Sequence, residues 1–195
     1  MSVAIVKYNA GNVRSVMTAL ERLDVSYAVT DDRRELLSVY RVIFPGVGEE
    51  SSAERYLAER GLDDTIRALT APVLGICLGL QLLCEWSEEG PTNCLGIMPG
   101  TVKRFTKPRK IPHMGWSRVE ALSHPIFRDI AEGSYFYFVH SFRLDVTTET
   151  IATCRYEESF AAAVARGNFV GVQFHPEKSA DVGERMLRNF LEWKV

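Results

Sequence analysis

The chain alternates short apolar runs with segments in which apolar residues recur every three or four positions. The first run, Val3 to Tyr8, contains several β-branched residues and predicts a buried strand. After turn residues at Asn9–Asn12, apolar side chains recur at helical spacing between Val13 and Leu23. Three later apolar runs predict further strands, at Tyr27–Val29, Arg41–Phe44 and Pro72–Ile76. The first half therefore predicts four strands separated by helical segments.

The helical segments between these strands carry recognisable signals. Ser51 followed by Glu54 has the spacing of a capping box and predicts a helix start that leads toward Arg60. Apolar spacing predicts further helices over 62–69 and 78–85. A β-α-β-α alternation favours an open, mostly parallel central sheet flanked by helices. Such sheets bind ligands beyond the carboxyl ends of their strands, so we expect the chemistry there.

The C-terminal half has strand-like runs that follow each other more closely. They lie at 101–105, 135–140, 151–155, 160–165 and 169–174. The turn Arg166-Gly167-Asn168 predicts a hairpin between the last two. Additional antiparallel strands should extend the sheet or form a small second one, and 182–191 reads as a closing amphipathic helix. We expect an α/β fold in a single domain over 1–195.

Composition and charge narrow the functional classes. The 195 residues are 46% hydrophobic and 25% charged, and the net charge of −2 gives no reason to expect nucleic acid or an anionic membrane as a partner. No apolar run approaches the ~20 residues that span a bilayer, and the start lacks a signal-peptide pattern, so we expect a cytoplasmic protein. The four cysteines lack CxxC spacing. We expect reduced thiols, no metal ion and no cofactor.

One cysteine stands in a special setting. Cys77 lies between Gly75 and Gly79, where the fourth strand ends and a helix begins. A tight bend between two glycines would lift the sulfur above the sheet edge, and the helix N-terminus would favour thiolate over thiol. Cys77 is thus a candidate nucleophile, and the alternative is a buried core cysteine. For Cys84 and Cys154, which have no such turn, we expect core packing.

A cysteine nucleophile needs a base and a group that orients the base. His175-Pro176-Glu177 ends the strand that we predict up to Phe174, and an extended Pro176 would let both side chains project toward the same strand end. The alternative is a histidine at a strand terminus beside a surface glutamate. His113, His124 and His140 compete for the role of base. His124 precedes a proline in a predicted loop, whereas His140 ends an aromatic strand and could line a pocket.

A glycine loop follows the third strand. In Pro45-Gly46-Val47-Gly48, the glycines permit backbone conformations that are closed to other residues. The loop could aim the N–H of Val47 at a developing oxyanion, with the N–H of Leu78 as the second donor. The alternative is an ordinary turn. A phosphate-binding loop is disfavoured, because no Gly-Lys-Ser/Thr follows.

Together these motifs resemble a known family. Gly75-Ile76-Cys77-Leu78-Gly79-Leu80-Gln81, with the glycine loop upstream and His175-Pro176-Glu177 downstream, resembles the class I (triad) glutamine amidotransferases. Further segments resemble the glutaminase subunits of imidazole glycerol phosphate synthases. They are Tyr8–Ser15, Pro112–Trp116, Tyr137–Ser141 and Val172–Ser179. Departures from the commonest pattern include Glu49-Glu50 after the glycine loop and Ser117 where Asn is frequent.

The resemblance implies a Cys-His-Glu triad of Cys77, His175 and Glu177, which hydrolyses glutamine to glutamate and ammonia. It implies a cyclase partner, a (β/α)8 barrel, in a heterodimer that makes imidazole glycerol phosphate and an aminoimidazole carboxamide ribonucleotide in histidine biosynthesis. It also implies further residues beside the triad. Substrate-binding candidates are Gly46, Gly48, Gln81, His140 and Ser141, and interface candidates are Asn12, Trp116 and Lys178.

Three other interpretations stay open on the sequence. One is the glutaminase subunit of another ammonia-channelling complex, such as pyridoxal phosphate synthase; Tyr8–Ser15 and Pro112–Trp116 argue against it. A second is a non-enzymatic relative with a redox-sensitive cysteine. A third is a nucleic-acid binder, for which the basic residues of 103–110 would be the contact, although a solvated loop is the preferred explanation for them and docking to the partner the second.

Overall fold

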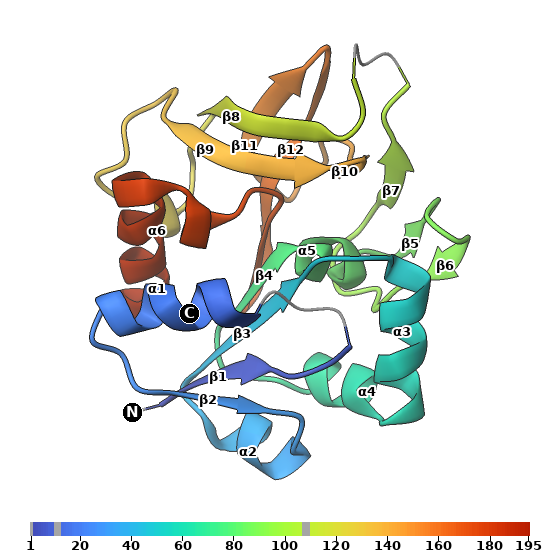
Figure 1. Ribbon diagram of the computed structural model, residues 1–195, viewed down its shortest axis with the longest axis vertical. Coiled ribbons are helices and arrows are strands. Elements are labelled where there is room, and N and C mark those ends of the chain that lie inside the picture. Colours follow the sequence, from blue (N-terminus) through green and yellow to red (C-terminus); the bar gives the residue numbers. More distant parts are fainter. Residues whose placement is uncertain (1, 10–12, 107–109) are drawn as a thin grey trace.

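The computed structural model describes residues 2–9, 13–106 and 110–195, and its centre is a nine-stranded mixed sheet (Figure 1). Its parallel half has the order β2-β1-β3-β4-β13. The bounds are β1 Val3–Val6, β2 Tyr27–Thr30, β3 Arg41–Gly46, β4 Val73–Cys77 and β13 Phe169–Val172. β1, β3, β4 and β13 are buried along their whole length, as expected of parallel strands that are covered on both faces.

The other half of the sheet is antiparallel and continues from β13 in the order β12-β11-β8-β9. The bounds are β12 Glu158–Arg166, β11 Thr150–Tyr156, β8 His113–Glu120 and β9 Tyr135–His140. β12 and β13 form the predicted hairpin, and Gly167 in its turn has a φ of +58°. A second, four-stranded sheet has the order β10-β7-β5-β6, with β10 Phe142–Leu144, β7 Thr101–Arg104, β5 Trp86–Ser87 and β6 Thr92–Asn93. The strands of the C-terminal half therefore both extend the central sheet and contribute to a small second one, which are the two arrangements that the sequence allowed.

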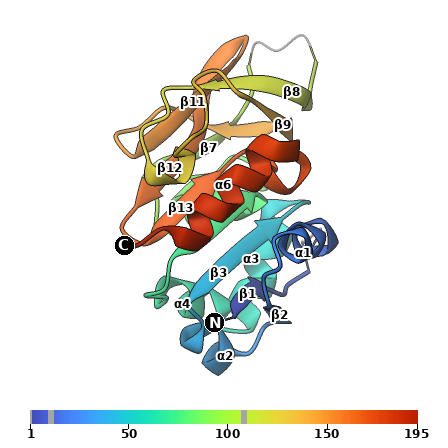
Figure 2. The ribbon, with the colours of Figure 1, turned by 90° about the vertical axis from the view of Figure 1, so that its left-hand side faces the viewer.

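Helices cover both faces of the parallel half. Side chains of β1 alternate, so that Val3 and Ile5 join one apolar cluster and Ala4 and Val6 the other. The first cluster is completed by α1 (Val13–Arg22) and α6 (Ala180–Glu192), which lie together in front of the sheet in Figure 2. The second is completed by α2 (Arg33–Ser38), α3 (Glu50–Glu59), α4 (Leu62–Arg67) and α5 (Leu78–Leu83). The fold is the α/β architecture that the hydrophobic pattern predicts.

Local details differ from the sequence-based expectations. The capping box is wrong, because α3 begins at Glu50 with Glu49 as its N-cap, and Ser51 lies inside the helix. The last strand ends at Val172 instead of Phe174: the N–H of Gln173 still bonds to Ala162 of β12, but that of His175 bonds to Tyr137 of β9. Pro176 is not extended, since it opens the 3-10 helix η2 (Pro176–Lys178). The strand β8 was not expected, and another 3-10 helix, η1 (Pro125–Phe127), starts after His124.

Candidate active site

The chain makes a strained turn at Cys77, the last residue of β4. Its φ is +53°, a left-handed conformation that a cysteine rarely adopts, and α5 begins at the next residue. A Cβ atom on Gly79 would lie 1.9 Å from the carbonyl oxygen of Phe44 on β3, and one on Gly75 would lie 2.9 Å from the backbone of Gly79. The two glycines thus let α5 pack directly against the sheet. The predicted bend at Cys77 is present in the structure.

The glycine loop lies beside this turn. Gly46, the last residue of β3, is opposite Cys77 in the register of β3 and β4, so Val47 and Gly48 extend past the sulfur. Gly48 has a φ of +118°, which favours glycine. The hydroxyl of the buried Tyr8 donates to the carbonyl of Pro45 at 2.7 Å and fixes the peptide that precedes Gly46. The loop is therefore held at its start by a side chain from the segment after β1.

His175 is held by its backbone at the junction of the two halves of the sheet. Its N–H donates to the carbonyl of Tyr137 on β9 at 2.8 Å, and its carbonyl accepts from the Ser179 hydroxyl at 2.6 Å. The Ser179 oxygen in turn accepts from the N–H of Tyr137 at 3.0 Å. The Ser179 hydroxyl thus links the backbone of His175 to that of Tyr137. The position of the His175 backbone is therefore fixed by β9 as well as by the segment that contains His175.

The imidazole of His175 is paired with a carboxylate. Its Nδ1 is 2.8 Å from Oε1 of Glu177, and both residues are buried. Burial alone would lower the pKa of His175, but the negative charge of the nearby Cys77 sulfur and the hydrogen bond with Glu177 outweigh it and raise the pKa to about 10. The site therefore favours an imidazolium beside the sulfur at neutral pH.

A pocket of about 310 Å³ opens at the sulfur of Cys77. Its wall comes from the glycine loop, α5, the turn between β5 and β6, and the link between β9 and β10. The lining residues are Val47, Gly48, Cys77, Leu78, Gln81, Glu89, Pro112, Val139, His140, Ser141 and Phe142. The sulfur is thus placed where β4 ends, beyond the carboxyl edge of the parallel strands, as expected for this class of sheet.

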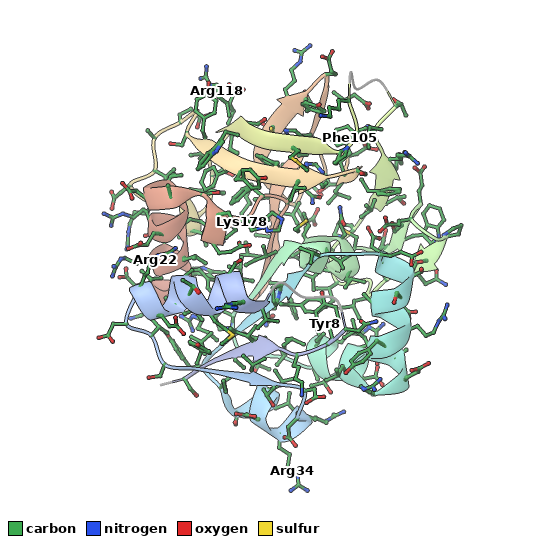
Figure 3. All side chains as sticks on the ribbon, viewed as in Figure 1. Tyr8, Arg22, Arg34, Phe105, Arg118 and Lys178 are labelled. Atoms are coloured by element: carbon green, nitrogen blue, oxygen red, sulfur yellow. The ribbon has the colours of Figure 1, made fainter. Side chains whose placement is uncertain are left out.

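Seven of the residues singled out in the sequence line this pocket, namely Val47, Gly48, Cys77, Leu78, Gln81, His140 and Ser141. His175 and Glu177 are buried and are not among the lining residues, and Gly46, Trp116 and Lys178 do not line the pocket either. Gly46 faces the Tyr8 hydroxyl and the Leu78 side chain, and its assignment to substrate binding stays a prediction. Trp116 is half exposed on β8. Lys178, which is labelled in Figure 3, is exposed in η2 directly after Glu177. Asn12 lies outside the described residues, as do Lys107 and Arg109 of the basic segment.

The competing histidines have other roles in the structure. His140 lines the pocket, and its Nδ1 lies 2.7 Å from the carbonyl of Phe142, which can only accept, so that nitrogen carries the proton. Nε2 of His140 then accepts from Nδ1 of His113 at 3.0 Å, and Nε2 of His113 accepts from the Ser117 hydroxyl at 2.8 Å. His124 caps η1 with its side chain. His113 and His140 are therefore neutral hydrogen-bonding groups.

Two residues at the site were not singled out from the sequence. Glu89 lines the pocket from the turn between β5 and β6, and no local pattern marks it. Gln173 is fully buried next to Cys77, and its place two residues before His175 was a usable signal. Cys84, Cys94 and Cys154 are buried free thiols, and burial raises the pKa of each. Among the described residues, no group of three or more His, Cys, Asp or Glu is arranged to hold a metal ion.

Comparison with known proteins places the chain among relatives of one kind. Residues 5–193 match the family model described as glutamine amidotransferase class-I. The chain is 49% identical to imidazole glycerol phosphate synthase subunit HisH of Bacteroides fragilis, over 98% of this chain and 100% of that protein. It is 43% identical to the protein of the same name from Shewanella loihica, over 96% and 89%.

Solved structures share the fold at lower identity. A putative GMP synthase protein from Thermoplasma acidophilum matches with a TM-score of 0.78 and 18% identity, over 98% of this chain and 92% of that one. A structure titled glutamine amidotransferase matches with a TM-score of 0.76 and 21% identity, over 97% of both chains. In the part of the chain that the structure describes, no helix is long and apolar enough to cross a membrane.

Proposed function

The chain belongs to the class I glutamine amidotransferase family, as a glutaminase subunit of imidazole glycerol phosphate synthase, and we propose that Cys77, His175 and Glu177 are its catalytic triad. In this role it hydrolyses glutamine in histidine biosynthesis, in a complex with the cyclase subunit. The family match over 5–193 supports one domain for the whole chain. The observation that carries the triad is the strained Cys77 at the pocket, next to an imidazole whose pKa its charge raises to about 10.

The first half of the reaction forms a thioester. The Cys77 sulfur attacks the side-chain amide carbon of glutamine, an S–C bond forms, and the carbonyl electrons move onto oxygen. The N–H groups of Val47 and Leu78 then donate to this oxyanion, and one such donor is typically worth about 3–4 kcal/mol. As the C–N bond breaks, the imidazolium of His175 gives its proton to the departing nitrogen, which leaves as ammonia.

The second half restores the sulfur. His175, now neutral, accepts a proton from water, the resulting hydroxide attacks the thioester carbon, and the S–C bond breaks to return the thiolate. Glu177 stabilises the imidazolium in both halves of the reaction, because its Oε1 lies 2.8 Å from Nδ1 of His175. This contact keeps a proton on Nδ1. The other nitrogen is thereby kept for the proton exchange with the leaving nitrogen and with water.

The pocket suits free glutamine as the substrate. A carboxylate, Glu89, stands in its wall and would pair with the α-ammonium group of the amino acid. Polar groups near the sulfur come from Gln81, Ser141 and the loop at Gly48, and the uncharged imidazole of His140 forms part of the wall. Glu89 also accepts from the N–H of Glu50 at 3.0 Å, so the same carboxylate reaches the start of the helix that follows the glycine loop.

The cyclase partner would dock against the exposed side of β8 and β9 and form a heterodimer with this chain. Large apolar side chains that are at least half exposed stand there, namely Met114, Trp116 and Tyr135. β9 is bonded to the backbone of His175, and Lys178 follows the triad directly, so this surface borders the active site. At neutral pH free ammonia is mostly ammonium, which cannot attack, so passage into a barrel-shaped partner preserves the reactive form.

Two experiments test the proposal. Treatment with a glutamine-like alkylating agent is expected to label Cys77, and labelling of Cys84 in its place would overturn the triad.

Glutaminase turnover is expected to rise when the cyclase is added together with its nucleotide ligand, because a peptide flip in the glycine loop would complete the oxyanion hole only in the complex. Equal rates with and without them would reject this gating.

A further inference from the structure

Gln173 lies beside the sulfur for a reason that the strand register makes plain. Val172, the last residue of β13, pairs with Ile76 of the parallel strand β4, so the residues that follow them, Gln173 and Cys77, are neighbours. Gln173 is fully buried, and a buried amide is costly unless it is hydrogen-bonded. Its Nε2 lies 3.7 Å from the Sγ of Cys77, within the range of an N–H donor to sulfur. The amide therefore touches the reacting atom.

The orientation of this amide follows from one backbone carbonyl. The carbonyl of Phe142 can only accept, and it lies 3.1 Å from Nε2 of Gln81, which must therefore be the donor. The second N–H of the same nitrogen donates to Oε1 of Gln173 at 3.1 Å. With its oxygen turned toward Gln81, Gln173 presents its own N–H groups to Cys77. Gln81 keeps its Oε1 as an acceptor for a substrate in the pocket.

The two protonation states of the sulfur use these neighbours differently. A thiol can donate to the carbonyl of Val139, which lies 3.8 Å from Sγ. A thiolate can only accept, so on ionisation it loses this bond and strengthens the one from Gln173. The amide of Gln173 is thus a donor that prefers the ionised sulfur, and the positive charge of the His175 imidazolium favours the same state. They come from the same segment, two residues apart.

We propose that Gln173 is a further residue of the catalytic machinery, whose amide N–H holds the ionised sulfur of Cys77 while Gln81 acts as the positioning residue for that amide. The proposal rests on the proposed role of Cys77 as nucleophile. It gives Gln81 two functions, because the residue that faces the pocket also orients the donor behind the sulfur. An incoming substrate that contacts Gln81 would therefore act on the same hydrogen-bonded chain as the nucleophile.

The test is the pH profile of Cys77 alkylation by chloroacetamide, in the complex with the cyclase, followed by mass spectrometry of the Cys77 peptide. In Gln173→Met we expect alkylation at pH 6.5 to slow about tenfold, the size expected for one hydrogen bond to a charged group, and to approach the unchanged rate at pH 9.5. A purely structural role would slow the reaction equally at every pH, and that result, or an unmoved profile, would overturn the proposal.

Two further variants keep the outcome interpretable. Asn189→Leu removes another buried amide, on α6, which donates to the carbonyls of Ile126 and Arg128, and we expect it to change stability but not the shape of the profile. If Gln173→Met does not fold, Gln81→Met leaves Gln173 in place without its orienting partner and should move the profile in the same direction by a smaller amount. Labelling of a different cysteine in the unchanged chain would instead contradict the proposed function itself.

Discussion

The hydroxyl of Tyr8 donates to the carbonyl of Pro45 across 2.7 Å inside the protein, at the point where β3 gives way to the glycine loop. A Cβ atom on Gly46 would lie 2.2 Å from the same hydroxyl, so Tyr8 fits only because the residue after Pro45 is a glycine. Burial raises the pKa of Tyr8 well above its usual range, and the charge of Cys77 adds to this effect, so the phenol stays a donor. Tyr8 therefore sets one end of the segment that carries Val47.

Replacing Tyr8 with phenylalanine should weaken both stability and turnover. The Pro45 carbonyl would lose its buried donor, which typically costs about 1–3 kcal/mol of unfolding free energy. The loop that precedes Val47 would also be less fixed, so kcat should fall more than KM changes. Urea denaturation and steady-state glutaminase kinetics in the complex measure the two effects.

Tyr27→Phe is the matched control for this change. The Tyr27 hydroxyl also makes a 2.7 Å hydrogen bond, to Glu21, but on the surface and far from the loop. We expect a small change in stability and none in kcat. If Tyr8→Phe behaved like Tyr27→Phe, the proposed role of the buried phenol in holding the loop would be wrong.

Substitution of Gly79 by alanine should disrupt the turn at Cys77. The new Cβ would lie 1.9 Å from the Phe44 carbonyl oxygen, and this backbone atom cannot move without shifting β3. We expect a loss of several kcal/mol of unfolding free energy and the loss of glutaminase activity, as for other changes that overpack a core. Gly96→Ala is the comparison: it meets no atom within 4 Å and bears only the strain of its φ of +66°, about 1 kcal/mol. Equal effects of the two variants on stability would refute the packing argument.

The sequence was sufficient for the parallel half and for the turn at Cys77, because both leave local signals. Continuous apolar runs mark β1, β3 and β4, and the glycines around Cys77 mark a turn whose strain is visible in its φ of +53°. The strand β8 was missed because its residues do not alternate between apolar and polar: the exposed positions hold Met114 and Trp116, whereas a buried position holds His113. Glu89 could not have been found, since only the tertiary fold brings the turn between β5 and β6 to the pocket.

The second glutamate after the glycine loop predicts an unusual pH dependence of stability. Glu50 is fully buried at the start of α3; burial raises its pKa to about 8, the nearby Ser87 hydroxyl opposes this shift, and the charge of Glu89 adds to it. The folded chain thus keeps a proton that the unfolded chain releases near pH 4.5. The contribution of Glu50 to stability is fully present below about pH 4.5 and is lost as the pH rises to about 8.

Glu50→Gln removes this dependence while keeping the shape of the side chain. We expect the variant to lose less unfolding free energy than the unchanged chain between about pH 5 and pH 8, as measured by chemical denaturation at both pH values. Glu59→Gln, at the exposed end of the same helix, should leave the dependence as it was. Parallel pH profiles for all three proteins would show that Glu50 is not protonated in the folded state.

The pair His113 and His140 predicts the opposite slope at lower pH. Burial lowers the pKa of His113 to about 4 and that of His140 to about 3; for His140 the Phe142 hydrogen bond opposes the shift, and the charges of His113 and His175 add to it. Below about pH 6.5 the unfolded chain binds protons that the folded chain refuses, so stability falls as the pH drops toward 4. In His113→Gln, whose amide can still donate to His140, the unfolding free energy should fall less steeply with decreasing pH. The difference in slope should correspond to at most one proton fewer taken up on unfolding. An unchanged slope would mean that His113 is charged in the folded protein.

The most direct measurement compares two nitrogen sources in the complex with the cyclase. In Cys77→Ala, glutamine-dependent formation of imidazole glycerol phosphate should be abolished, because no sulfur remains to form the thioester. Formation from added ammonium salt at alkaline pH should continue at the rate of the unchanged complex, because the cyclase receives ammonia directly. Glutamine-dependent synthesis that survived the loss of this one sulfur would contradict the assignment of Cys77 as the nucleophile.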